Sequence, residues 1–173
     1  SMTFNASLSG AVVSLDSGAD SVTFVTKVAG SSTLFGGGGI QTVNFSSAAD
    51  LVSFDGVFGS GSVFGGSGND TLVFQNGSSI NASTVIKLGA GNDSLVFNGN
   101  TVSGQFGGLA GNDYVGGSIS VGNSAVSFWG GSGNDTFDMS MIIGVGGAGT
   151  AYFWNEEGTD SIVLGSVISG GFD

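Results

Sequence analysis

The chain has 173 residues, about one domain, with 35 glycines and no proline, cysteine or histidine. Lys27 and Lys87 are its only cationic side chains, against 13 carboxylates, and the formal net charge is −11. This composition excludes disulfides, zinc sites built on thiolate or imidazole, and catalysis that needs His, Cys or Arg. It also argues against nucleic-acid binding, because affinity for phosphates comes from Lys and Arg.

Hydrophobic residues make up 40% of the chain and include 14 phenylalanines, which is enough apolar surface for a core. No stretch approaches the ~18 apolar residues of a membrane span, so we expect no membrane insertion. No basic segment followed by an apolar stretch opens the chain, as it would in a cleavable signal peptide. Ser1-Met2 is typical of residues that remain from cloning. We interpret residues 1–173 as a single domain and a piece of a longer protein.

A short unit recurs along the chain: a small residue, Gly, any residue and Asp, then alternating apolar residues. Its copies span residues 17–24, 38–45, 67–74, 90–97, 110–117, 132–139 and 157–164. The residues at the Asp position are Asp20, Gln41, Asp70, Asp93, Asp113, Asp135 and Asp160. Two residues earlier stand Gly18, Gly39, Gly68, Gly91, Gly111, Gly133 and Gly158. A glycine in every copy predicts a positive φ or a close approach of two backbones.

The apolar residues after each Asp position alternate with polar ones, which predicts a strand with one buried face. A second apolar stretch precedes each turn, and no window has an uninterrupted helical pattern. We therefore predict an all-β fold, a right-handed parallel β-solenoid of about seven coils of 20–25 residues. Stacked coils would place Phe24, Phe45, Phe74 and Phe97 in one internal ladder.

The spacing of the repeat is irregular at one point. The step from Gln41 to Asp70 is 29 residues long and has room for an extra half-coil. Residues 50–54 match the strand half of the repeat but lack the preceding Gly, so the alignment assigns no role to Asp50.

Stacking the coils also stacks the aspartates. Two carboxylates ~5 Å apart repel by roughly 1 kcal/mol in water and by several at an effective dielectric constant of 20. With almost no Lys or Arg nearby, the remaining remedies are solvation at an exposed edge, raised pKa values or a bound cation. Ca²⁺ takes 6–8 oxygen ligands, including backbone carbonyls, in flexible geometry, and fits better than Mg²⁺. The sequence therefore favours calcium along one edge.

The predicted calcium ligands are the stacked aspartates and the glycines of the fullest turns. They are Asp20, Gly68, Asp70, Gly91, Asp93, Gly111, Asp113, Gly133, Asp135 and Asp160. The alternative is that the aspartates only hydrogen-bond their own turns. We expect the asparagines before the aspartates to shape the turns, and Glu156 and Glu157 to be solvated.

The segments FGGSGNDTLVF (64–74) and WGGSGNDTFDM (129–139) resemble the GGxGxDxUx nonapeptide of RTX repeat proteins. That nonapeptide marks a calcium-binding parallel β-helix. RTX β-rolls repeat every nine residues, whereas the interval here is 20–29 residues, so calcium is expected along one edge only. The resemblance implies secretion without a cleaved signal and folding in extracellular calcium. It also implies a bacterial cell-surface setting, such as an S-layer protein or a large repeat adhesin.

We therefore expect a structural calcium-binding module whose folding is coupled to Ca²⁺ binding, not an enzyme. No carboxylate pair stands out for glycoside hydrolysis, and the scarcity of cations disfavours lyase chemistry. The alternative function is a calcium-dependent carbohydrate- or ice-binding module, although the threonines form no regular column. Expected partners are calcium ions, with self-association or cell-surface polysaccharide as further options.

Trp129 and Trp154 stand six residues before their aspartates, in the same predicted column as Phe35 and Phe64. This placement favours a position in the core or in an edge stack. The alternative is a sugar-stacking platform that includes Tyr114 and Tyr152.

Overall fold

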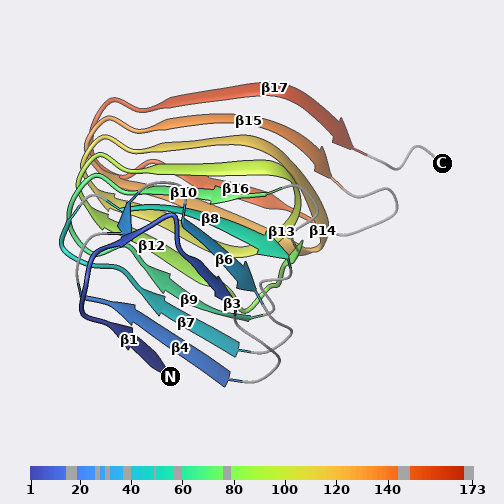
Figure 1. The fold of residues 1–173 in the computed structure, drawn as a ribbon. Helices are drawn as coiled ribbons and strands as arrows, with labels where there is room; N and C mark the ends of the chain where they lie inside the picture. The colour runs from blue at the N-terminus through green and yellow to red at the C-terminus, as the bar shows by residue number, and fades with distance from the viewer. Residues whose placement is uncertain are drawn as a thin grey trace.

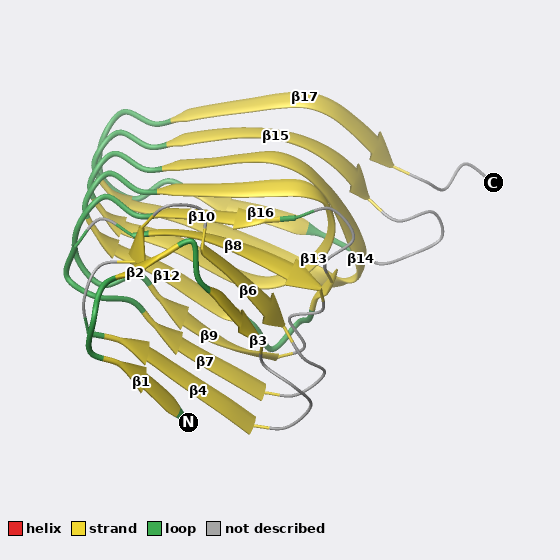
Figure 2. Ribbon diagram, viewed as in Figure 1, coloured by secondary structure: helices red, strands yellow, loops and turns green. Residues whose placement is uncertain are grey.

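In the computed structural model, the chain winds through successive coils of parallel strands and forms a β-solenoid (Figure 1, Figure 2). The structure describes residues 1–14, 19–25, 28–29, 32–36, 40–48, 50–56, 60–75, 79–143 and 149–169. None of these residues forms a helix, so no described helix could cross a membrane. The strands are β1 (Met2–Phe4), β2 (Leu8–Ser9), β3 (Val12–Ser14), β4 (Ala19–Phe24), β5 (Val28–Ala29), β6 (Ser32–Gly36), β7 (Ile40–Asn44), β8 (Leu51–Gly56), β9 (Ser60–Phe64), β10 (Thr71–Phe74), β11 (Ser79–Ile80), β12 (Val85–Ala90), β13 (Ser94–Ala110), β14 (Tyr114–Ser132), β15 (Thr136–Ile143), β16 (Ala151–Trp154) and β17 (Ser161–Ser169).

Strands from successive coils pair in parallel and build two faces. Face A contains β1, β4, β7, β9, β12, the C-terminal parts of β13 and β14, and β16. Face B contains β3, β6, β8, β10, the N-terminal parts of β13 and β14, and β15 and β17. The long strands β13 and β14 bend from face B onto face A (Figure 1). The predicted all-β parallel solenoid is confirmed, and its coil number is close to the seven expected.

The core lies between the two faces and is filled by every second residue of the strands. In β10, Leu72 and Phe74 are buried, whereas Thr71 and Val73 are partly exposed. Inward residues of neighbouring coils stack on one another because the strands are in register. One such buried column on face A contains Val22, Val43, Val63, Ile86, Phe106 and Phe128.

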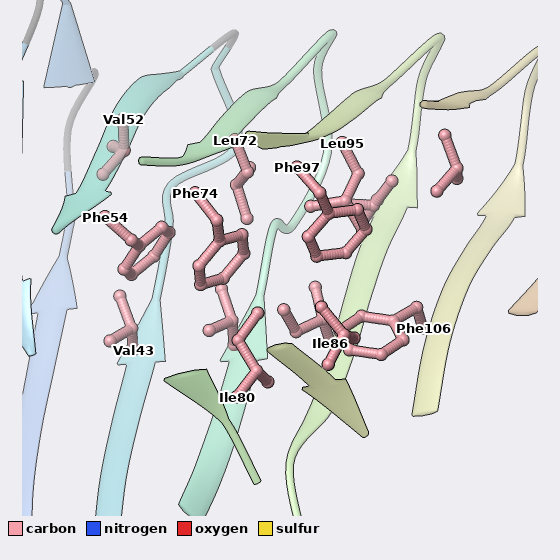
Figure 3. Packing of buried hydrophobic residues seen from close by; sticks show 14 of the residues in the cluster. Val43, Val52, Phe54, Leu72, Phe74, Ile80, Ile86, Leu95, Phe97 and Phe106 are labelled. Carbon is pink, nitrogen blue, oxygen red and sulfur yellow. The ribbon is translucent and has the colours of Figure 1, made fainter. Parts of the chain in front are cut away.

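The phenylalanines form three stacks instead of the single predicted ladder. The stacks are Phe4–Phe24–Phe45, Phe54–Phe74–Phe97 and Phe106–Phe128–Phe153. Neighbouring ring centroids lie 4.7–5.7 Å apart, and the middle stack is seen in Figure 3. The predicted continuity from Phe45 to Phe74 is wrong, because Phe45 follows a strand of face A and Phe74 lies on face B.

The early and the late repeat copies begin at different points of the coil, which explains this difference. Asp20 pairs with Gln41, and Gln41 pairs with Gly61, so the first two repeat copies continue along face A. β10, which follows Asp70 directly, pairs with β8 and β13 on face B. The long step between Gln41 and Asp70 therefore holds an extra half-coil. The prediction that Asp20 and Asp70 share one column is wrong.

We predict that Phe74→Ala lowers the free energy of unfolding by about 3–5 kcal/mol, because it leaves a cavity between Phe54 and Phe97. Phe64→Ala is the matched control. Phe64 is 39% exposed on the outer surface of face A, and its loss should cost less than about 1 kcal/mol. Urea unfolding followed by circular dichroism compares the two variants. Equal losses would contradict the inward and outward placement of these side chains.

Candidate functional site

Turns of one shape join face A to face B along one edge of the solenoid, which we call the turn edge. They end at Asp70, Asp93, Asp113, Asp135 and Asp160. The glycine two residues before each aspartate has a φ between +119° and +144°, a range that favours glycine. A Cβ on Gly91 would also overlap the carbonyl oxygen of Gly68 in the preceding coil. In these turns, the predicted glycine column is confirmed, and both a positive φ and a close approach require it.

A hydrogen-bonded ladder of aspartates follows the turn edge. The main-chain N–H of each aspartate donates to Oδ1 of the next one toward the C-terminus, over 2.7–2.8 Å. The ladder runs through Asp50, Asp70, Asp93, Asp113, Asp135 and Asp160. All members before Asp160 are at most 3% exposed. From Asp50 to Asp135, each coil thus draws one carboxylate into the protein interior.

The exposed asparagines of the turns form a second ladder of opposite polarity. Here the main-chain N–H of one coil donates backward, to the asparagine Oδ1 of the preceding coil, over 2.7–2.8 Å. The acceptors are Asn69, Asn92, Asn112 and Asn134. In addition to backbone–backbone hydrogen bonds, neighbouring turns are therefore tied by one buried and one exposed hydrogen bond to a side chain. The asparagine side chains connect the turns to one another as well as shaping them.

The aspartates of the ladder differ in their second oxygen. Oδ2 of Asp50 accepts hydrogen bonds from the N–H and the hydroxyl of Ser46, both at 3.1 Å. Oδ2 is buried and has no hydrogen-bond partner among the described residues in Asp70, Asp93, Asp113 and Asp135. A buried carboxylate oxygen without a partner is costly, so each of these four groups requires a proton or a cation.

Burial raises the pKa of these carboxyls. It raises the pKa of Asp70 from 3.8 to about 7, although the hydrogen bond from the N–H of Asp50 lowers it. The pKa of Asp113 rises to about 7 for the same main reason, and the neighbouring carboxylates add to the rise. Burial also raises the pKa values of Asp93 and Asp135. Without a cation, the folded ladder therefore holds protons at pH values where an exposed aspartate is ionised.

Carbonyl oxygens lie close to two of the unpartnered oxygens. A Cβ added to Gly65 would lie within 2.8 Å of both Oδ2 of Asp70 and the carbonyl oxygen of Leu88. A Cβ added to Gly108 would likewise meet Oδ2 of Asp113 and a glycine carbonyl oxygen of the next coil. At both places a carboxylate oxygen and a carbonyl oxygen lie beside the same glycine. These are the ligand types that calcium prefers.

The turn edge is a linear site and not a compact metal centre. Within the described ranges, no group of three or more His, Cys, Asp or Glu side chains could hold a metal ion. A cation bound at the ladder would therefore take most of its ligands from backbone carbonyls. No protein-family model, curated protein or solved structure matches the chain.

All predicted calcium ligands except Asp20 lie on the turn edge. Asp20 is the second residue of β4 on face A, in register with Gln41. Asp50, to which the alignment assigned no role, is a member of the ladder. Its signal in the sequence was a separation of 20 residues from Asp70, like that between Asp93 and Asp113. The missing glycine before Asp50 hid this relationship.

The two tryptophans lie on the outer surface of face A. Trp129 is half-buried and pairs with Trp154, which is 51% exposed and stacks on Tyr152 at 6.4 Å. The predicted core position is therefore wrong for both tryptophans. The aromatic stack that Trp154 forms with Tyr152 lies on the outside of the sheet. Phe64 belongs to the same column, whereas Phe35 lies on face B, paired with Asp55.

We predict that the free energy of unfolding of the metal-free protein falls as the pH rises from about 4 to about 7. Folded Asp70 and Asp113 keep their protons up to a pH of about 7, whereas the unfolded chain releases them near 3.8. The folded state binds more protons in this window, so raising the pH favours unfolding. The free energy of unfolding should fall by an amount on the order of several kcal/mol. Urea unfolding in chelator measures this slope. A stability that rises over the same range would contradict the raised pKa values.

Proposed function

We propose that the turn edge binds a row of calcium ions, and that the protein is a structural calcium-binding module of a secreted or cell-surface protein. The row of buried, unpartnered Oδ2 atoms of Asp70, Asp93, Asp113 and Asp135 carries this proposal. A divalent cation neutralises such oxygens at neutral pH without a proton. Calcium accepts carboxylate and carbonyl oxygens in flexible geometry, whereas magnesium demands a stricter octahedron and keeps its waters.

The four unpartnered aspartates would supply the charged ligands, and backbone carbonyl oxygens near the turns, such as that of Leu88 in β12, would supply the neutral ones. An ion held between two turns joins successive coils, which makes its role structural. Asp160 accepts the N–H of Asp135 and would end the row. Asp50 lies outside the set, because Ser46 and Val28 already donate to its two oxygens.

Calcium binding would be coupled to folding. The chain carries a net charge of −11 and 35 glycines, so the unfolded state is expanded and rich in conformational entropy. At neutral pH the metal-free fold must also bury carboxylates or retain protons on them. A cation removes that penalty only in the folded state, so its binding free energy contributes directly to folding.

The resemblance of the turns to RTX repeats supports an extracellular or bacterial cell-surface location. Such a chain would stay unfolded where calcium is scarce and fold in the calcium outside the cell. A stack of coils that repeats in one direction suits a spacer or stalk, as in an S-layer protein or an adhesin.

We predict that the far-UV circular dichroism spectrum in chelator at neutral pH is mostly coil, and that millimolar calcium produces a β signal. The cation supplies the charge compensation that the buried carboxylates lack. Magnesium at the same concentration is the control and should have a much weaker effect. A spectrum that calcium leaves unchanged would remove the coupling of binding to folding.

A second prediction separates ladder members that have an unpartnered oxygen from one that does not. Asp113→Asn should increase the β signal of the metal-free protein at pH 8, because it removes a buried charge and keeps the Oδ1 acceptor. It should also reduce stabilisation by calcium, by about 2.7 kcal/mol at a concentration 100 times the Kd of that site. Circular dichroism in chelator measures the first effect, and thermal unfolding at increasing calcium concentrations measures the second.

Asp50→Asn is the matched control for this experiment. Asp50 occupies the same ladder, but Ser46 already donates to its Oδ2. This variant should keep the full stabilisation by calcium. The same loss in both variants would contradict the assignment of the ions to the unpartnered oxygens.

A further inference from the structure

A hollow of about 220 Å³ opens on the outer surface of face A. It interrupts an outward column that runs through Phe64, Lys87, Gly107, Trp129 and Trp154 in successive coils. Gly107 has no side chain and leaves a gap one coil wide. Lys87 and Trp129 line the gap from the coils before and after it.

Polar side chains complete the hollow. Gln105, two residues before Gly107 on β13, is exposed and lines it, as does Glu156 from the segment after β16. The hollow thus offers an amide, an ammonium and a carboxylate around one aromatic side chain. These groups can donate to and accept from neutral hydroxyls in several directions.

Leu109 forms the apolar flank of the hollow, and its backbone is strained. It has a φ of +87° and is the only non-glycine residue with a positive φ in the described ranges. Its partners in the neighbouring coils are Gly89 and Gly131, which have φ values of +118° and +103°. The Leu109 side chain is 45% exposed, and a Cβ added to Gly107 would lie 3.8 Å from its Cδ2.

The leucine is therefore not explained by packing of the core. An L-residue in this conformation is strained, and such strain is typical of binding sites. Here the fold uses glycine in the neighbouring coils and accepts a strained leucine only where it flanks the hollow. The strain at Leu109 therefore supports a binding site independently of the tryptophan that lines the hollow.

We propose that the hollow binds one pyranose residue of a neutral glycan. The face of an indole ring carries negative potential and attracts the C–H groups on the apolar face of a sugar ring. Gln105, Lys87 and Glu156 would hydrogen-bond the hydroxyls at the ring edge. The net charge of −11 disfavours an acidic polysaccharide. The site is separate from the calcium ladder, so the proposal does not depend on the identity of the ion.

The test is a titration of ¹⁵N-labelled protein, folded in calcium, with the methyl pyranosides of glucose, galactose and mannose. The chain has two tryptophans and hence two indole N–H signals, which Trp→Phe variants assign. At least one glycoside should shift the Trp129 signal with a Kd on the order of 1 mM, as expected for so small a ligand, and leave that of Trp154 in place. Glucitol, which has hydroxyls but no ring, should shift neither signal.

Two variants separate binding from folding. Leu109→Gly should weaken sugar binding by roughly tenfold, because it removes the apolar flank. Its melting temperature should be no lower than that of the parent, since glycine relieves the positive φ. Trp154→Ala is the matched control, an exposed tryptophan of the same column that does not line the hollow, and should bind like the parent.

Three results would overturn the proposal. The first is the absence of any shift with all three glycosides up to about 100 mM, a hundredfold above the expected Kd. The second is binding of methyl glucuronide alone, which would assign the hollow to acidic sugars. The third is an equal loss of affinity in Trp154→Ala and Leu109→Gly, which would place the sugar on the exposed aromatic column and outside the hollow.

Discussion

The turn edge is governed by four carboxylates that successive coils bury without satisfying them completely, those of Asp70, Asp93, Asp113 and Asp135. One oxygen of each accepts a main-chain N–H of the preceding coil, which fixes the height and register of the two turns. The other oxygen faces the interior without a partner among the described residues. The same group that joins two coils therefore creates a demand for positive charge. Only a proton or a cation meets this demand, since the chain has two lysines and no arginine.

Other features of the edge follow from this arrangement. Turns that stack closely enough for an aspartate to reach the next coil bring their backbones into contact, which only glycine permits at Gly91 and its equivalents. The asparagine ladder donates in the opposite direction and keeps the exposed side of each turn in register. Because the inner and outer positions of a strand alternate, the outer surface of face A is free to vary. Its aromatic column and the hollow at Gly107 do not take part in the ladder.

The sequence was sufficient to predict the all-β solenoid, because alternating apolar residues and a glycine in each turn are local signals. The glycines before Asp70, Asp93, Asp113 and Asp135 have the positive φ that their recurrence indicated. The position of each repeat within its coil was harder to predict from the sequence. Both faces use the same strand pattern, so Asp20 and Asp70 look equivalent in the sequence and lie in different columns of the fold.

Two further features depended on spatial neighbours. Asp50 lacks the glycine that marks its column, and only its hydrogen bonds with Ser46 and Asp70 reveal its position. The outward direction of Trp129 and Trp154 also required the register of the strands, since apolar side chains on an outer surface resemble core residues in a sequence. The strain at Leu109 is a property of the backbone that no residue pattern predicts.

Diffraction from crystals grown at neutral pH with calcium tests most directly how the buried oxygens are neutralised. Anomalous peaks should line the turn edge, one beside each unpartnered Oδ2 from Asp70 to Asp135, at about 2.3–2.6 Å from that oxygen. No peak is expected beside Asp50, whose Oδ2 already holds two hydrogen bonds. A turn edge without metal density, in which the aspartates remain buried, would show that protons alone stabilise the ladder and would contradict a calcium-binding role.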